Sequence, residues 1–131
     1  MRIRIIVPLL ATAVLSACTS VNAGLSNPIV TIPSDRFAPA VTESVSGGTV
    51  TFHNADADAH TVTSLPGASV KFDLVIPSGA TRTLKLSSPG TYRYFCRFHA
   101  HYDPRTDQVA ANPKADHPDE PMAGVIVVAR S

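Results

Sequence analysis

The chain has 131 residues, and its 11 lysines and arginines stand against 10 aspartates and glutamates, so its formal net charge at pH 7 is +1. This balance gives no reason to expect nucleic acid binding, which needs concentrated positive charge. The length suits one small domain with one hydrophobic core. Eleven prolines and seven glycines, together with many valines and threonines, favour short strands joined by turns.

The first segment has the form of an export signal. Two arginines, Arg2 and Arg4, precede a short apolar run, which is typical of a signal peptide. The run is too short to cross a bilayer, a task that needs about 20 apolar residues. It ends in Leu-Ser-Ala-Cys at residues 15–18, which resembles a bacterial lipobox.

The lipobox resemblance implies that residues 1–17 are removed and that Cys18 is acylated. Residues 18–27 would then be a lipidated tether, and the protein would be exported to the cell envelope or periplasm and held on the lipid bilayer. Ordinary cleavage after Ala23 is the alternative. Both outcomes leave Cys96 as the single thiol of the exported domain, which is unusual because exported cysteines normally pair.

The rest of the chain alternates short apolar-patterned runs with turn residues, and this pattern predicts an all-β sandwich. No stretch has a convincing helical period with caps. The expected strands are 28–32, 41–45, 49–54, 60–63, 71–76, 81–86, 91–96 and 124–128.

Residues 100–121 interrupt the strand pattern before the last strand. The segment holds four prolines and five acidic residues and shows no apolar period. We therefore expect a long insertion loop, of the kind that is either functional or disordered in compact domains.

Four side chains combine nitrogen and sulfur donors for a metal. Cys96 ends one expected strand, and His99 follows it in a C-x-x-H spacing. His60 begins another strand, and Met122 precedes the last one. Two imidazoles, one thiolate and one weakly held axial thioether are the donors of a blue-copper site.

The sequence resembles a cupredoxin of the plastocyanin and pseudoazurin type. The resemblance rests on residues 48–52 followed by His-Thr-Val at 60–62, on the P-G-x-Y-x-x-x-C-x-x-H stretch at 89–99, and on the M-x-G-x-I-x-V ending at 122–128. It implies that residues 28–131 form a Greek-key β-sandwich of about seven or eight strands. It also implies one copper per chain, cycling between Cu(I) and Cu(II), with His60, Cys96, His99 and Met122 as ligands.

The chain departs from the family pattern in three ways. In the family only a few residues usually separate the second histidine from the methionine, whereas 22 do so here. Arg97 stands where a small hydroxyl residue is common, and Phe98 stands where proline is common. His101 and His117 are therefore alternatives to His99 as the second imidazole.

The function expected from these residues is single-electron transfer by a membrane-anchored copper protein, with redox proteins at the membrane surface as partners. The alternative is a periplasmic copper-binding protein for tolerance or delivery, in which histidines and acidic residues of the insertion add ligands. A metal-free sandwich used as a scaffold is a third reading. We do not expect an enzyme, because no hydrolase triad is apparent and the ligand set leaves no strongly available open position.

Overall fold

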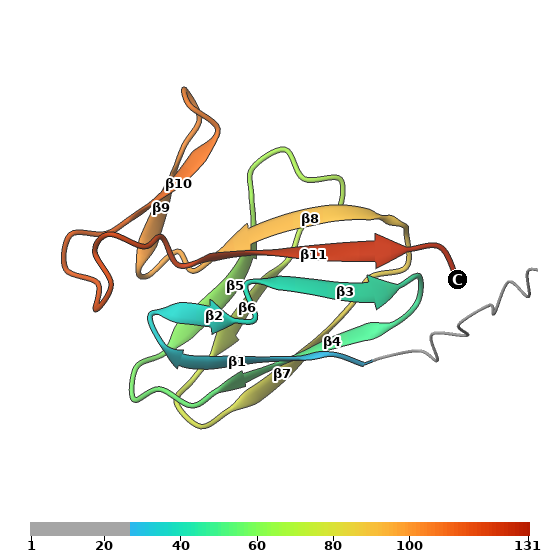
Figure 1. Cartoon of the computed structure of the whole chain (residues 1–131), viewed down its shortest axis with the longest axis horizontal. Helices are drawn as coiled ribbons and strands as arrows, with labels where there is room; N and C mark the ends of the chain where they lie inside the picture. The colour runs from blue at the N-terminus through green and yellow to red at the C-terminus, as the bar shows by residue number, and fades with distance from the viewer. Residues whose placement is uncertain (1–26) are drawn as a thin grey trace, which may run out of the picture.

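A computed structural model describes residues 27–131, which form two β-sheets packed face to face and a separate two-stranded hairpin (Figure 1). The expected signal peptide and nearly all of the expected tether, including Cys18, lie outside the described residues. Within residues 27–131, no helix has the length and apolar character that a membrane crossing would need.

One sheet contains four strands in the order β2-β1-β4-β7. Strands β1 and β4 run parallel, and the other two pairs run antiparallel. The bounds are Ile29–Ser34 for β1, Arg36–Ala38 for β2, Thr49–Asn54 for β4 and Thr81–Lys85 for β7.

The other sheet contains five strands in the order β3-β11-β8-β5-β6. Strands β3 and β11 run parallel and the rest antiparallel. Their bounds are Val41–Val45 (β3), His60–Ser64 (β5), Asp73–Ile76 (β6), Gly90–Phe95 (β8) and Ala123–Ala129 (β11). The chain crosses repeatedly between the sheets, as Greek-key connections do.

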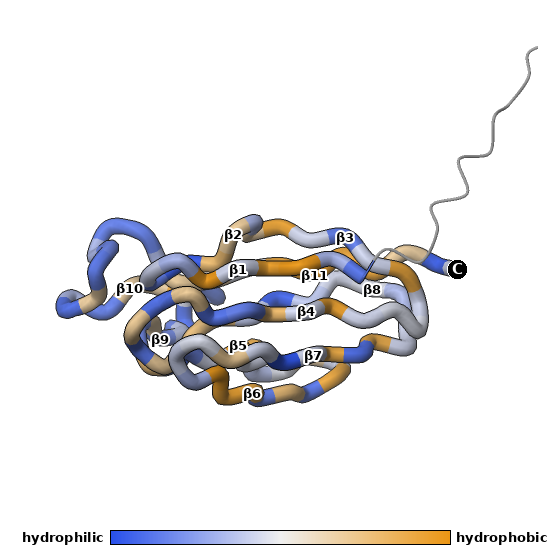
Figure 2. Tube along the Cα trace, turned by 90° about the horizontal axis from the view of Figure 1, so that it is seen from below, coloured by the Kyte–Doolittle hydropathy of each residue, from blue (hydrophilic) through white to orange (hydrophobic). Residues whose placement is uncertain are grey.

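Alternating burial along the strands produces the core between the sheets. In β4, Val50, Phe52 and Asn54 are buried while their neighbours are half-buried, which is the period of two that a sheet with one inward face requires. Figure 2 shows the resulting apolar segments along the strands and the mostly hydrophilic loops at the end that carries β9 (Ala100–Asp103) and β10 (Gln108–Ala111).

Three aromatic rings occupy the centre of this core. Phe37 and Phe52 each meet the ring of Tyr94 edge to face, with centroids 4.8 Å and 5.6 Å away, a favoured arrangement for aromatic pairs. Gly124 lies opposite Tyr94 in the β8–β11 pair, and a Cβ on Gly124 would overlap the Tyr94 ring. A glycine is needed there because the ring occupies the space of a side chain.

The all-β sandwich predicted from the sequence is confirmed, and each of the eight expected strands is present at slightly different bounds. The segment 100–121 was expected to be a loop, and that part of the prediction is wrong. It contains a hairpin of β9 (Ala100–Asp103) and β10 (Gln108–Ala111). Tyr102 and Val109 face each other across the hairpin and pack against the core.

The hairpin was missed because each of its strands has only four residues, too few for a periodic pattern to stand out. Its turn is closed by Asp107, which adopts a φ of 54° and accepts a hydrogen bond from the Tyr102 hydroxyl at 3.0 Å. In Figure 1 the hairpin lies at the end of the sandwich opposite the start of β1 and the C-terminus.

Candidate metal centre

The start of β5 and the connection between β8 and β9 bring potential metal ligands together at the hairpin end of the sandwich. His60 is the first residue of β5, Cys96 directly follows β8, and His99 lies in the turn between β8 and β9. Strands β5 and β8 are hydrogen-bonded neighbours, so the sheet itself sets the separation of His60 and Cys96.

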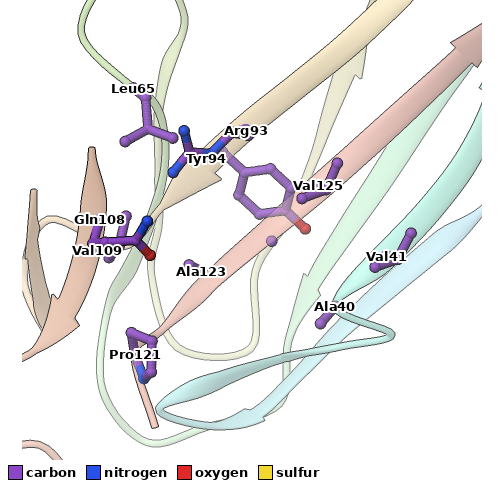
Figure 3. Close-up of a pocket in the computed structure, with 11 residues that line it drawn as sticks. Ala40, Val41, Leu65, Arg93, Tyr94, Gln108, Val109, Pro121, Ala123 and Val125 are labelled. Atoms are coloured by element: carbon purple, nitrogen blue, oxygen red, sulfur yellow. The ribbon is translucent and has the colours of Figure 1, made fainter. Parts of the chain in front are cut away.

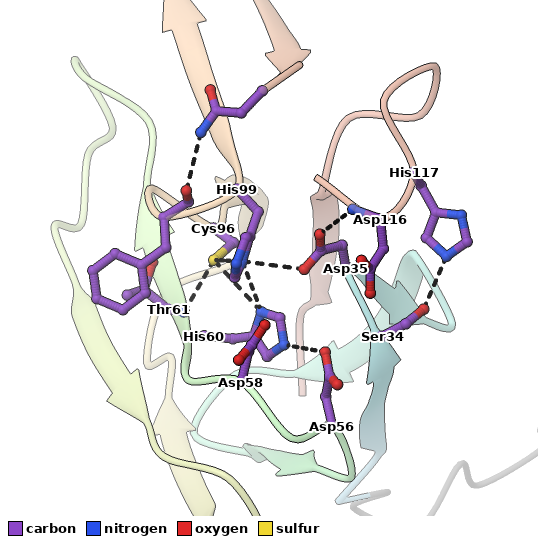
Figure 4. A network of polar contacts seen from close by, with 12 residues as sticks. Ser34, Asp35, Asp56, Asp58, His60, Thr61, Cys96, His99, Asp116 and His117 are labelled. Carbon is purple, nitrogen blue, oxygen red and sulfur yellow. Dashed lines mark hydrogen bonds and ion pairs between the residues drawn. The ribbon is translucent and has the colours of Figure 1, made fainter. Parts of the chain in front are cut away.

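The three donor atoms form a small triangle (Figure 4). His60 Nδ1 lies 3.1 Å from His99 Nδ1. Cys96 Sγ lies 3.8 Å from His60 Nδ1 and 3.5 Å from His99 Nδ1. The side chains of His60 and Cys96 are fully buried, and that of His99 is 20% exposed. The three donors therefore converge on one point, and His99 is the only one of them that reaches the surface.

A carboxylate fixes which nitrogen of His60 can bind a metal. His60 Nε2 lies 2.8 Å from Asp56 Oδ2, and an ionised carboxylate can only accept a hydrogen bond. The proton therefore sits on Nε2, and Nδ1 presents its lone pair to Cys96 and His99. Metal-binding histidines commonly have such a second contact, which orients the ring.

The loop that carries Asp56 is held by Asn54, a fully buried side chain at the end of β4. The Asn54 amide nitrogen donates to the carbonyl oxygens of Asp58 and Ile76, at 2.7 Å and 3.0 Å, and its Oδ1 accepts from the backbone N–H of Asp56. Neither the contact of Asp56 with His60 nor the contacts of Asn54 were predicted from the sequence. The apolar-polar alternation of β4, which puts Asn54 inside, was the available signal.

The Cys96 thiol is held in a setting that favours its thiolate. Burial alone would raise its pKa, but the contact with His60, hydrogen bonds from the backbone N–H groups of Thr61 and Phe98, and the contact with His99 outweigh burial and lower the pKa to about 6. Burial likewise acts to lower the pKa of His60, and contacts with Cys96 and Asp56 raise it overall. The lowered pKa of Cys96 favours its thiolate, the form that binds a metal.

Arg97, one of the departures from the family pattern, is accommodated by neighbouring strands. Its backbone N–H donates to the Thr61 hydroxyl at 3.0 Å. Thr61 thus supplies a hydroxyl group that hydrogen-bonds the loop after Cys96, where residue 97 itself has none. The Arg97 guanidinium contacts both carboxylate oxygens of Asp73 and lies 4.7 Å from the centre of the Phe98 ring. These contacts tie the segment after Cys96 to β5 and β6.

The insertion 100–121 fixes the other side of the His99 turn. Asn112 uses its backbone N–H to bind the His99 carbonyl at 2.9 Å and its side-chain amide to bind the Phe98 carbonyl at 3.0 Å. A largely apolar pocket of about 390 Å³ opens beside His99, and it is lined by Phe98, His99 and residues 112–115. His99 thus borders a recess that the insertion helps to form.

The two alternative histidines lie elsewhere. His101 is exposed on β9, with Nδ1 3.3 Å from Asn112 Oδ1. His117 lies 2.9 Å from the hydroxyl of Ser34. His99 is thus the second imidazole that the structure brings to Cys96.

Met122 is buried beside Cys96. Its carbonyl accepts the Cys96 backbone N–H at 3.0 Å, and 1% of the residue is exposed. Met122 therefore lies next to Cys96 although the insertion separates it from His99 in sequence. This is the position that the M-x-G-x-I-x-V ending at 122–128 predicts for the methionine. Its role as an axial ligand remains a prediction.

A second hollow, of about 230 Å³, lies away from these donors, between β8, β11 and the hairpin (Figure 3). Leu65, Val109, Pro121 and Val125 give it an apolar lining, and Arg93 supplies its charge. Its lining contains no histidine, cysteine or carboxylate, so it is distinct from the metal centre.

Comparison with known proteins agrees with this fold. The family described as a cupredoxin-like domain matches residues 5–109. That span covers most of the chain and includes His60, Cys96 and His99. The protein therefore belongs to the cupredoxin-like family. A search of the curated proteins finds no match.

Solved structures of amicyanin are similar to this chain. The reduced state of one amicyanin variant shares 23% identity over 82% of this chain and 86% of that chain, with a TM-score of 0.56. An oxidised amicyanin variant shares 22% identity over 78% of this chain and 81% of that chain, also with a TM-score of 0.56. A purple cupredoxin from Nitrosopumilus maritimus shares 20% identity over 78% of this chain and 99% of its own, at 0.55. At these identities the similarity shows a common fold.

The family implies a single copper, and the residues present fit one. A point equidistant from the three donor atoms lies about 2 Å from each, close to the 2.0–2.3 Å of zinc–nitrogen and zinc–sulfur bonds in proteins. One soft sulfur with two imidazoles suits both oxidation states of copper. His60, Cys96 and His99 are thus the candidate copper site of this chain.

Proposed function

We propose that the protein is a membrane-anchored mononuclear copper protein that carries single electrons between redox proteins at a membrane surface. Its strong ligands would be His60, Cys96 and His99, with Met122 as the weak axial ligand. The observation that carries the proposal is the buried convergence of two imidazole nitrogens and one thiol sulfur in a cupredoxin sandwich. When bound, copper supplies a one-electron couple between Cu(I) and Cu(II).

The contribution of the chain is to keep the ligands in place while the charge on the metal changes. His60 and Cys96 are held by paired strands, and the Thr61 N–H lies 3.3 Å from Cys96 Sγ as a hydrogen-bond donor. A donor to sulfur and fixed imidazole orientations limit rearrangement between two oxidation states. When the ligands move little between the two oxidation states, electron transfer is fast, and this suits an electron carrier better than a protein that stores or delivers metal.

The exposed edge of His99 is the proposed point of electron entry and exit. Among the three donors, it alone reaches the surface, and Phe98 beside it is 43% exposed. The apolar pocket next to His99 is walled on one side by residues 112–115 of the insertion. We infer that the insertion restricts which redox partners can approach this edge, since electron-transfer contacts are usually small.

The membrane anchor is proposed from the sequence around Cys18. The start of β1, which follows the first described residues, lies at the end of the sandwich opposite the β9–β10 hairpin (Figure 1). A tether attached there would leave the His99 edge facing away from the bilayer. Labelling with an alkyne fatty acid should mark the wild-type chain, and Cys18→Ser should abolish both the label and recovery in the membrane fraction. Equal membrane recovery of the unlabelled variant would contradict this anchor.

The structure offers little support for copper handling through the insertion. His101 and His117 contact Asn112 and Ser34, while Asp103 pairs with Arg105 and Asp107 pairs with Arg93. Within residues 27–131, both groups of three potential ligands include His60 and neither includes an insertion residue. We therefore favour one copper per chain and an electron carrier without catalytic activity of its own.

The deciding experiment is a titration of the full chain with Cu(II), followed by visible and EPR spectroscopy. We expect an intense thiolate-to-copper absorption that saturates at one equivalent and is lost in Cys96→Ser. Weak colour, or several equivalents that bind regardless of Cys96, would reject the electron carrier and support copper handling. His101→Ala is the matched control, because its imidazole lies nearby but outside the donor triangle.

A further inference from the structure

A hydrogen-bonded chain of three side chains, the Thr61–Thr63–Asp73 relay, runs from the metal centre to the protein surface. At its inner end Thr61 is fully buried, and its backbone N–H lies 3.3 Å from Cys96 Sγ (Figure 4). The Thr61 hydroxyl lies 2.9 Å from the hydroxyl of Thr63, which lies 2.6 Å from Asp73 Oδ1. At its outer end Asp73 is exposed and contacts Arg97.

The sheet places the relay residues side by side. Thr61 and Thr63 are two apart on β5, so their side chains point to the same face of the sheet. Asp73 is the partner of Thr63 in the antiparallel β5–β6 pair, and side chains of such partners are close enough to interact. The relay is therefore built on paired strands and not on a loop.

The direction of the hydrogen bonds follows from the number of hydrogens available. Hydrogen bonds from the Arg97 guanidinium and then from Thr63 lower the pKa of Asp73, and an ionised carboxylate can only accept. The single hydroxyl hydrogen of Thr63 therefore goes to Asp73. The hydrogen between the two threonines must then come from Thr61.

This direction satisfies the buried hydroxyl of Thr61 completely. Thr61 donates to Thr63, and its oxygen accepts the backbone N–H of Arg97 at 3.0 Å. In the reverse direction, the Thr61 hydrogen would have no acceptor among these contacts. A buried donor without an acceptor costs about 1–3 kcal/mol, so Asp73 sets the orientation of a hydroxyl that it does not touch.

Arg97 closes the relay into a ring. Its backbone N–H binds Thr61 at one end, and its guanidinium Nε and Nη2 contact Asp73 at 3.2 Å and 3.1 Å at the other. The peptide that directly follows Cys96 is thus part of a closed set of hydrogen bonds. Members of such a set polarise and strengthen one another. The ring ties that peptide to the strand whose Thr61 N–H faces the Cys96 sulfur.

We propose that Thr63 and Asp73 are positioning residues for Cys96, acting through Thr61 to hold the Thr61 N–H against the thiolate sulfur. This inference rests on the proposed copper function. Hydrogen bonding around the cysteine sulfur tunes the reduction potential of such a copper site. A donor to sulfur withdraws negative charge from the thiolate and so favours Cu(I). The relay therefore raises the reduction potential from side chains that contact neither the metal ligands nor the metal.

The first test compares Thr63→Val with Thr63→Ser in the copper-loaded full chain. Valine has the shape of threonine without the hydroxyl, and serine keeps the hydroxyl. We expect Thr63→Val to keep the thiolate-to-copper absorption while Cu(I) affinity falls about threefold or more relative to Cu(II), a drop of about 28 mV at about 59 mV per tenfold change. Thr63→Ser should retain the wild-type potential.

Thr51→Val is the matched control, because Thr51 is a half-buried threonine of the other sheet. It should leave the reduction potential unchanged. A wild-type potential in Thr63→Val, or an equal shift in Thr51→Val, would overturn the proposal. Absence of the thiolate-to-copper absorption in the wild-type chain would instead reject the proposed copper function.

A second test uses the metal-free chain and does not depend on copper. Amide hydrogen exchange at Arg97 reports its bond to Thr61 directly. Exchange should be faster in Asp73→Ala, which removes the acceptor of Thr63, and closer to wild type in Asp73→Asn, whose amide oxygen can still accept. Unchanged exchange in Asp73→Ala would reject the relay. Equal acceleration in both variants would assign the effect to the lost charge and would also overturn the proposal.

Discussion

The two sides of the metal centre are built by different means. On one side, His60 at the start of β5 and Cys96 just after the end of β8 are fully buried, and Asn54 and Asp56 hold the loop between β4 and β5. On the other side, the His99 turn is held by Asn112 of the insertion, and the His99 side chain is partly exposed. The sheet therefore fixes the side that carries Cys96, and the insertion 100–121 holds the side that meets solvent.

The largest expected effect separates the two imidazoles. His60→Gly and His99→Gly should both abolish the thiolate-to-copper absorption of the normal site. Added imidazole should restore it only in His99→Gly, because a pocket of about 390 Å³ adjoins that residue whereas His60 is enclosed. Visible spectra with and without imidazole measure this. Rescue of both variants would show that the sheet side is as open as the insertion side.

The thiolate of the metal-free chain tests the sheet side by pH. Because its pKa is lowered from 9.0 to about 6, Cys96 should titrate near pH 6 in the folded chain and near 8.5 after unfolding. In between, the unfolded chain binds more protons, so this group stabilises the fold increasingly as pH rises through that window. The ultraviolet absorbance of the thiolate, with Cys96→Ser as blank, reports the midpoint. A folded midpoint at or above 8.5 would contradict the contacts described.

Asp56→Asn should weaken the sheet side without removing a ligand. The contact between Asp56 and His60 Nε2 orients the ring, and loss of such a contact typically costs about 10–100-fold in metal affinity. Competition with a copper chelator measures the change. Asp58→Asn, in the same loop but exposed, is the control and should bind copper like the wild type. Equal losses in both variants would indicate a general charge effect.

Gly124→Ala tests how strictly the framework behind the site is packed. The new methyl group would overlap the Tyr94 ring, which sits at the centre of the aromatic cluster. Overpacking of this kind costs about 1–3 kcal/mol, and chemical denaturation of the metal-free chain would measure it. Gly79→Ala is the control, because Gly79 lies in a surface turn where an added Cβ meets no atom within 4 Å. Its φ of +69° means that this variant reports the strain of the turn and not overpacking. A larger loss there would mean that turn strain, and not core packing, limits this framework.

The difference between the two sides also explains what could be predicted from the sequence. Strands such as β4 and β8 carry a clear alternation, so the sandwich and the closeness of His60 and Cys96 followed from sequence pattern. The β9–β10 hairpin did not, because Tyr102 and Val109 are too few to form a pattern and are stabilised by tertiary packing. Asp35, a buried carboxylate that contacts His99 and the backbone N–H of Asp116, was missed for a related reason. Its partners are at residues 99 and 116, and nothing local marks a contact at that separation.

The smallest expected effect concerns the turn of the hairpin. Asp107 accepts hydrogen bonds from Arg93 at 2.8 Å and from Tyr102 at 3.0 Å, but Arg93 and Asp107 are both well exposed. Exposed ion pairs contribute about 0–1 kcal/mol, so Asp107→Ala should barely change the free energy of unfolding. It should still loosen the hairpin locally, which faster amide hydrogen exchange in β9 and β10 would show. The reduction potential of the bound copper should stay unchanged, because Asn112 and Asp116 hold the insertion near the metal centre independently of the hairpin turn. A shift of that potential in Asp107→Ala would show that the turn also influences the copper.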